Sequence, residues 1–151
     1  MRKITLCTLT TLITSFTVLA QSPEENVKKT IEQLFEGMRT ADSTMVSQTF
    51  ASGARMMTVV EENGSTRLQE GSVSRFLTAI GTPHDETWDE RILDYHIQID
   101  GKMATVWTPY RFYLGSTFSH CGVNAFQLYQ SDEGWKIIQV TDTRRKEDCP
   151  D

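Results

Sequence analysis

The second half of the chain consists almost entirely of strand-like segments, and this feature constrains the fold most. Four runs rich in β-branched and aromatic residues follow one another: Asp89–Ile99, Met103–Tyr113, Phe118–Gln130 and Trp135–Thr143. Tight turns containing Asp and Gly join the first run to the second and the third to the fourth. Because strands joined by such turns pair antiparallel, this half predicts a long antiparallel sheet.

The first half has a helical period instead. Three predicted helices begin after residues that commonly cap helix N-termini, namely Ser22, Asp42 and Ser72. Two strand-like runs around the turn Asn63-Gly64 lie between the second and third helices. The first helix has one apolar face, since its apolar residues recur at spacings of three and four: Val27, Ile31, Leu34, Phe35 and Met38.

This order of elements predicts an α+β domain in which three helices cover one face of a curved antiparallel sheet. The chain has 151 residues, of which 38% are hydrophobic and 23% charged, a composition typical of a globular protein. A chain of this length has room for one domain with a single core. We expect residues 21–151 to form that domain.

Residues 1–20 have the pattern of a secretory signal. Arg2 and Lys3 precede an apolar run, and Val18-Leu19-Ala20 forms a small-residue cleavage site before Gln21. A membrane anchor is the alternative, but six threonines interrupt the run, and a span needs about 20 mostly apolar residues. We therefore expect cleavage, export to the periplasm or the medium, and no stable membrane anchor.

Cleavage would leave two cysteines, Cys121 and Cys149. Because exported proteins meet an oxidising environment, we expect a disulfide between them that fastens the C-terminal tail to the outer face of the sheet. Counting outward from the turn at Asp132–Gly134 places Cys121 opposite about Lys146, a few residues before Cys149. The alternative is a buried apolar Cys121 and a free Cys149 thiol.

Charge and motifs exclude several classes of function. The net charge is −5, and would be −7 without residues 1–20, while the only basic run is the short Arg144–Lys146. This argues against nucleic acid as a partner, because phosphate binding needs a concentrated basic face. The histidines lack the spacing of a metal site, and no nucleophile motif or phosphate-binding loop is present. We expect neither a metal nor a cofactor.

Several segments resemble the nuclear transport factor 2-like superfamily, which includes SnoaL-like cyclases, ketosteroid isomerase and scytalone dehydratase. They are "FEGMRTADSTMVSQTFA", "GSVSRFLTAIG", "DGKMATVW" and "GWKIIQVTDT". The segments "FSHCG" and "AFQLY" are similar to a subgroup of exported bacterial members labelled lumazine-binding. The resemblance implies a cone-shaped, cystatin-like α+β barrel with one pocket between helices and sheet, and frequent dimerisation through the outer face. It implies no activity, because this fold hosts enzymes, ligand binders and assembly modules alike. The catalytic residues of ketosteroid isomerase and scytalone dehydratase have no counterparts here.

Strand alternation selects the residues that could line such a pocket. From Phe118 to Leu128 the even-numbered residues share one face, and Phe126 is expected to face the core. The same reasoning applied to the two preceding runs predicts a mostly apolar pocket with a few polar groups, the usual character of a ligand site. We expect the following residues to bind the ligand: Tyr95, Tyr110, His120, Asn124 and Phe126.

Adjacent strand residues point to opposite faces, so His120 and Cys121 do not form a nucleophile–base pair. His120 and Tyr110 are candidate acid–base groups, with Asp142 as a possible partner if its side of the last strand faces the pocket. The alternatives are a structural, hydrogen-bonded His120 and a solvated Asp142–Arg144 pair. A bulge at Gly122 would reverse the predicted alternation.

Three functions therefore stay open. The first is binding of a small apolar or aromatic molecule, the second is a cofactor-independent isomerase, dehydratase or hydrolase-like enzyme, and the third is an assembly module with a vestigial pocket. Trp107 and Met103 are predicted to project from the outer sheet face, where they favour a homodimer. We expect ligand binding to be the function.

Overall fold

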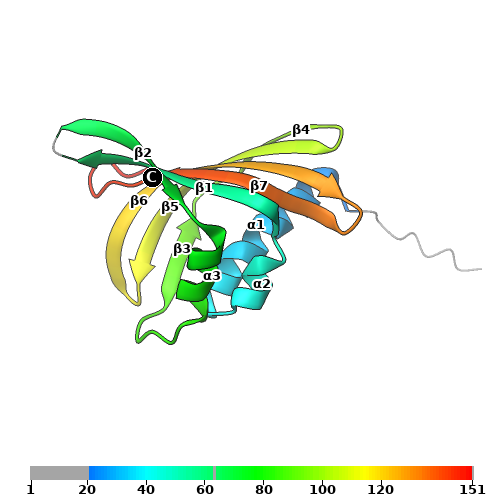
Figure 1. The fold of residues 1–151 in the computed structure, drawn as a ribbon. Helices are drawn as coiled ribbons and strands as arrows, with labels where there is room; N and C mark the ends of the chain where they lie inside the picture. Colours follow the sequence, from blue (N-terminus) through cyan, green and yellow to red (C-terminus); the bar gives the residue numbers. More distant parts are fainter. Residues whose placement is uncertain (1–20, 63, 151) are drawn as a thin grey trace, which may run out of the picture.

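The computed structural model describes residues 21–62 and 64–150, so the predicted signal segment lies outside the described residues. Three helices pack on one side of a curved sheet (Figure 1). The helices are α1 (Pro23–Arg39), α2 (Ser43–Ser47) and α3 (Val73–Gly81). The strands are β1 (Phe50–Glu62), β2 (Ser65–Gly71), β3 (Trp88–Ile92), β4 (His96–Asp100), β5 (Met103–Leu114), β6 (Thr117–Ser131) and β7 (Gly134–Thr143). The predicted α+β class is confirmed.

The strand order is β2-β1-β7-β6-β5-β3, with β4 also paired to β5. Neighbouring strands pair antiparallel, as predicted, except that β1 and β7 run parallel. No tight turn joins β1 to β7, which are far apart in the chain, so the turn-based prediction did not extend to this pair. The end strands β2 and β3 are not paired with each other, and the curved sheet is therefore an unclosed barrel.

Each predicted N-cap is confirmed. The cap side chain accepts a hydrogen bond from the backbone amide three residues later: Ser22 from Glu25 at 3.2 Å, Asp42 from Met45 at 2.8 Å and Ser72 from Arg75 at 3.4 Å. These bonds satisfy amides that have no partner inside the helix.

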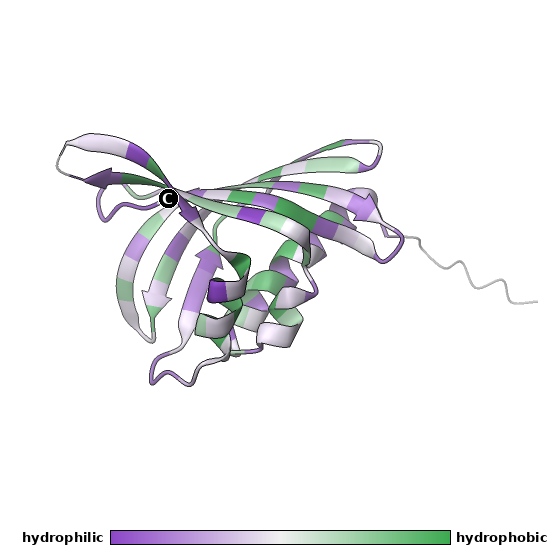
Figure 2. Ribbon diagram, in the orientation of Figure 1, coloured by the Kyte–Doolittle hydropathy of each residue, from purple (hydrophilic) through white to green (hydrophobic). Residues whose placement is uncertain are grey.

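The core lies between α1 and the middle of the sheet. Val27 and Ile31 of α1 are fully buried, as are Leu128 and Ile137 of the central strands. Figure 2 shows hydrophobic stretches on these strands and on the helices beneath them. The apolar face predicted for the first helix is therefore the face that packs on the sheet.

The predicted run Asp89–Ile99 forms two strands rather than one. β3 ends where Ile92 pairs with Tyr110, and β4 begins where His96 pairs with Trp107. Pro109 of β5 lies opposite the break, and its carbonyl accepts a bond from the Leu93 amide at 2.9 Å. Because proline has no amide hydrogen, it cannot donate to a continuous ladder, and the partner strand is interrupted here.

A β-bulge alters one prediction about β6. Phe112 pairs with His120 while Tyr113 pairs with Phe118, which leaves Ser119 as the extra residue. Phe118 is therefore shifted to the opposite face from His120, where its ring contacts Tyr113 at 5.8 Å between centroids. The expectation that Phe118 shares the inner face was wrong, because the bulge lies at Ser119 rather than at Gly122.

Gly122 allows an unusually close approach between β6 and the end of β7. A Cβ at this position would overlap the carbonyl oxygen of Thr143 and lie 2.8 Å from its carbon. That carbonyl accepts a hydrogen bond from the Tyr110 hydroxyl at 2.9 Å, while the Thr143 hydroxyl accepts one from the Val123 amide at 3.2 Å. Between β6 and β7, the Thr143 hydroxyl thus accepts the hydrogen bond from the Val123 amide in place of the Thr143 carbonyl.

A disulfide joins Cys121 to Cys149, with their Cα atoms 5.7 Å apart, and confirms the predicted pairing. Cys121 lies opposite Arg145, one residue from the predicted position, and the two exchange backbone hydrogen bonds of 2.8 and 2.9 Å. The Arg111 guanidinium donates to the Pro150 carbonyl at 3.0 Å. The C-terminal tail is thereby fastened to the outer sheet face, which leaves Cys121 fully buried.

We predict that Gly122→Ala lowers the free energy of unfolding by about 2 to 4 kcal/mol, because the new methyl group overlaps the Thr143 carbonyl. Urea denaturation measures the change. Gln127→Ala, on the exposed outer face of the same strand, is the control and should change stability by less than about 0.5 kcal/mol. Equal effects of the two substitutions would contradict the proposed constraint.

Candidate functional site

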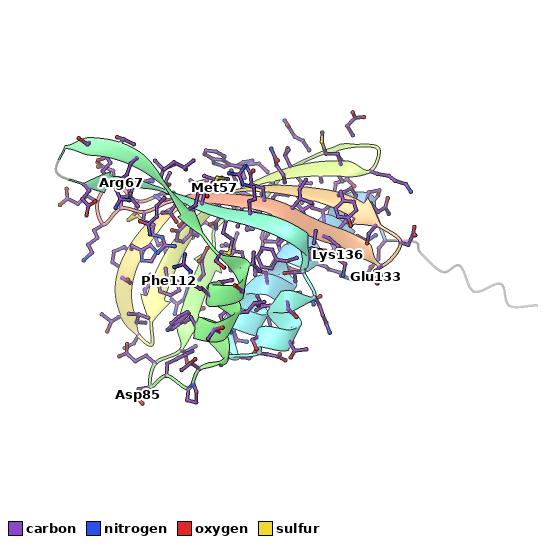
Figure 3. The ribbon with its side chains drawn as sticks, in the orientation of Figure 1. Met57, Arg67, Asp85, Phe112, Glu133 and Lys136 are labelled. Carbon is purple, nitrogen blue, oxygen red and sulfur yellow. A yellow bond between two sulfur atoms is a disulfide. The ribbon has the colours of Figure 1, made fainter. Side chains whose placement is uncertain are left out.

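A cavity of about 870 Å³ lies between the sheet and the helices. Its lining is mostly apolar and comes from both layers, including Phe35, Met38, Phe76, Trp88, Phe112 and Phe126. Figure 3 labels Phe112, which lies beneath the sheet on the side of the helices. The resemblance implies a pocket between helices and sheet, and this cavity is the candidate for it.

Five polar residues gather on one side of this cavity: Glu90, His120, Asn124, Asp142 and Arg144. We call this set the polar wall. Four of the five residues come from β3, β6 and β7, and Arg144 directly follows β7. The strand register aligns the inward-facing residues, since Glu90 and His120 both pair with Phe112, and Asn124 pairs with Asp142.

Asn124 connects two strands of the polar wall. Its side-chain amide donates to Glu90 Oε1 at 2.7 Å and to Thr108 Oγ1 at 3.3 Å. Asn124 is only 6% exposed, so these bonds lie in a water-poor environment. The expectation that Asn124 faces the pocket agrees with its place in the cavity lining.

Both carboxyl oxygens of Asp142 have partners. Oδ1 accepts a hydrogen bond from the Thr58 hydroxyl at 2.6 Å, and Oδ2 accepts one from Arg144 Nε at 2.7 Å. Asp142 is 9% exposed, and both it and Arg144 line the cavity. Of the two alternatives for this pair, the geometry favours the cavity wall over a solvated strand end.

Glu90 is the polar-wall residue that sequence reasoning missed. Burial raises its pKa to about 7, and the hydrogen bond from Asn124 opposes this rise only in part. The alternation in β3 contained the signal, because Trp88 and Ile92 flank Glu90 on the inner face while Asp89 and Arg91 point the other way. One continuous strand was predicted over Asp89–Ile99 with Tyr95 on its inner face, and this alternation places Glu90 on the outer face.

His120 lines the cavity as expected and is partly buried. Its ring lies 4.9 Å from that of Phe112 between centroids, and Nδ1 is 3.1 Å from the Ser119 hydroxyl. Burial, followed by the positive charge of Arg144, lowers the pKa of His120. The imidazole is therefore mainly neutral at pH 7.

Tyr110 and Tyr95 do not line the cavity, contrary to expectation. Tyr110 is 1% exposed, because the missing side chain at Gly122 lets its ring lie toward β7, where its hydroxyl bonds Thr143. Burial raises its pKa above the usual value. Tyr95 lies in the break between β3 and β4, with Lys28 Nζ 5.2 Å from its ring centroid, and burial raises its pKa to about 12.

No group of three or more His, Cys, Asp or Glu side chains is placed to hold a metal ion within residues 21–62 and 64–150. In the same part of the chain, no helix is both long and apolar enough to span a bilayer.

We predict that Glu90→Gln raises the free energy of unfolding at pH 8 by about 1 to 2 kcal/mol. A carboxyl with a raised pKa binds more protons in the folded state, so wild-type stability falls as pH increases from 4.5 through about 7. The variant has no carboxyl at this position, so its free energy of unfolding should exceed that of the wild type by an amount that grows from pH 4.5 through about 7. Thermal unfolding across pH measures the difference.

Glu133→Gln is the control for this prediction, because the Glu133 side chain is 83% exposed and stays in water in both states. A Glu90→Gln advantage that is the same at pH 5 and pH 8 would contradict the assigned environment of Glu90.

The comparisons with known proteins agree with this geometry. A family model described as "Putative lumazine-binding" matches residues 22–141. No curated protein sequence matches the chain.

Three solved structures show the same fold at low identity. An NTF2-like protein with a cystatin-like fold from Novosphingobium aromaticivorans has a TM-score of 0.65 and 11% identity, covering 83% of each chain. A putative dehydratase of the NTF2-like family from Streptomyces avermitilis has a TM-score of 0.61 and 15% identity, covering 82% of this chain and 96% of its own. A putative ketosteroid isomerase from Shewanella frigidimarina has a TM-score of 0.58 and 15% identity, covering 80% and 96%.

The resemblance seen in the sequence is thus confirmed by an independent match to most of the chain and by the shared fold. The chain belongs to the family described as putative lumazine-binding, and it shares its fold with NTF2-like proteins of solved structure.

Proposed function

We propose that this protein is an exported binding protein that holds a small apolar or aromatic molecule in the cavity between sheet and helices. The observation that carries the proposal is the cavity itself, with its volume of about 870 Å³, its mostly apolar lining and the polar wall on one side. Ligand sites are commonly of this size and character. The family description, with lumazine as the named ligand, supports the same class of function.

The open volume favours binding over an assembly module with a vestigial pocket. Large side chains such as Phe35, Phe76 and Trp88 border the cavity, but they leave its interior unfilled. Filling a cavity with side chains would stabilise a purely structural domain, since empty volume costs packing energy. An unfilled cavity is better explained by a ligand that occupies it.

Export is supported by the Cys121–Cys149 disulfide, because disulfides persist mainly in oxidising compartments. In this proposal residues 1–20 are removed as a signal, and residues 21–151 form the single domain. The exported protein meets its ligand in the periplasm or outside the cell.

A cofactor-independent acid–base enzyme is the second candidate. The specific observation that favours it is a cavity carboxyl, Glu90, with a pKa of about 7, on the same wall as His120 and Asp142. A group that titrates near neutral pH can both accept and donate a proton at the working pH. In this alternative Glu90 takes the role first given to Tyr110, whose hydroxyl is engaged with Thr143.

We predict that Ala79→Trp weakens ligand retention, because Ala79 is an exposed residue of the cavity lining and an indole there would obstruct entry to the cavity. Native mass spectrometry of protein purified from its host detects the retained ligand, and a fluorescence titration with lumazine tests the ligand that the family description names. The control is Thr78→Trp, on the adjacent exposed position of α3 outside the lining. Retention by Ala79→Trp equal to wild type would refute a ligand in this cavity.

We also propose that the protein is a homodimer formed through the outer sheet face. Trp107 and Met103 of β5 are 52% and 54% exposed there, and large exposed apolar side chains favour a partner surface. A stable interface buries on the order of 1,600 Å².

Trp107→Glu should therefore shift sedimentation toward the monomer, because a charge would be buried in the interface. Leu68→Glu is the matched control, since Leu68 is 56% exposed but lies on β2, at the far end of the sheet. A wild-type protein that sediments as a monomer at high concentration ends this proposal.

A further inference from the structure

The ion pairs around the cavity leave one carboxyl without a basic partner. Three carboxyl groups line the cavity, those of Glu70, Glu90 and Asp142. Arg55 pairs with Glu70 and Arg144 pairs with Asp142, both at 2.7 Å. No lysine or arginine within the described part of the chain lies within ion-pairing distance of Glu90, which therefore differs from the other two.

The neutral groups near Glu90 do not supply a positive charge. The Asn124 amide binds Oε1 at 2.7 Å, while Oε2 has no hydrogen-bond partner among the described residues. His120 of the same wall has a lowered pKa and is mainly neutral at pH 7. An ionised carboxylate that is partly removed from water without a counter-ion is costly, so a cation brought to Glu90 by a ligand would be stabilised.

The other charged groups that face Glu90 nearly cancel. Asp142 raises the pKa of Glu90 and Arg144 lowers it, but these two side chains are already paired with each other. Arg75 of α3 is the second guanidinium in the lining, and among the described residues it forms no ion pair with Glu90. With Glu70 paired to Arg55 and Asp142 paired to Arg144, an ionised Glu90 is the lining carboxylate that has no ion-pair partner within the described part of the chain.

We propose that the ligand carries a positively charged nitrogen on an aromatic or other apolar body, and that Glu90 is the counter-ion of this nitrogen. This inference rests on the proposed binding function and narrows the ligand to a class, an organic amine. The apolar body would occupy the rest of the lining, where Trp88, Phe112 and Phe126 present aromatic rings. Aromatic faces also attract cations, which adds to the same preference.

Trp88 is well placed to support the flat body of such a ligand. The His84 ring stacks on it with centroids 4.9 Å apart and an interplanar angle of 15°. Because this stack restricts the rotation of the indole, Trp88 can present a fixed surface to the cavity. Binding of a planar ligand then costs less free energy, since the Trp88 side chain is already ordered.

The test uses three probes that share one ring system and differ in charge: 2-naphthylmethylamine, 2-naphthylmethanol and 2-naphthoate. Isothermal titration of the full mature chain at pH 8 should show the amine binding about tenfold more tightly than the alcohol, and the acid most weakly. The advantage of the amine over the alcohol should fall at pH 5.5, where Glu90 is protonated. The amine keeps its charge over this range, since alkylammonium groups have a pKa near 10.

Glu90→Gln should remove the preference for the amine and leave the affinity for the alcohol within about twofold, because it keeps the size of the side chain and loses only its charge. Glu70→Gln is the matched control, since it removes a lining carboxyl that already has a basic partner. The control should keep the preference for the amine.

Three results would overturn the inference. If the acid binds most tightly, Arg144 or Arg75 sets the charge preference instead of Glu90. If the alcohol binds and the amine binds no more tightly, the ligand class is wrong while the proposed binding function stands. If none of the three probes binds, both the ligand class and the proposed cavity function fail.

Discussion

The contact between the Thr143 carbonyl and Gly122 determines how the end of β7 lies on β6, and the polar wall depends on this placement. Only a glycine admits the carbonyl here, and the Tyr110 hydroxyl then holds it at 2.9 Å. Asp142 and Arg144, on either side of Thr143, both face the cavity as a result. The Cys121–Cys149 disulfide fastens the chain just beyond this point, on the opposite face of the sheet.

The chemistry of the site follows from unequal pairing on the polar wall. Asp142 has a partner for each oxygen, whereas Glu90 has, among the described residues, only the Asn124 amide on one of its two oxygens. The difference explains why burial dominates the pKa of Glu90. It also makes Glu90 the group whose state a ligand or a substrate would change most, whether the protein only binds a molecule or transfers a proton to it.

The sequence predicted the features that depend on local patterns. Helix caps, the apolar face of α1 and the antiparallel hairpins are set by nearby residues, and counting from one turn placed Cys121 within one residue of its true partner position. The errors arose where distant contacts decide orientation. Tyr110 follows the inner-face alternation but fills the space above Gly122, and Phe118 is turned outward by a bulge that no single residue signals. Glu90 was missed because the break opposite Pro109 was not anticipated.

Glu90 is a cavity carboxyl with no counter-ion among the described residues, and its titration reports that environment directly. Carbon-13 NMR of the side-chain carboxyls across pH, with the Glu90 signal assigned by its loss in Glu90→Gln, reads the titration of this one group. We expect a midpoint at about pH 7 in the ligand-free protein. A midpoint near 4.5, the ordinary value for glutamate, would contradict it.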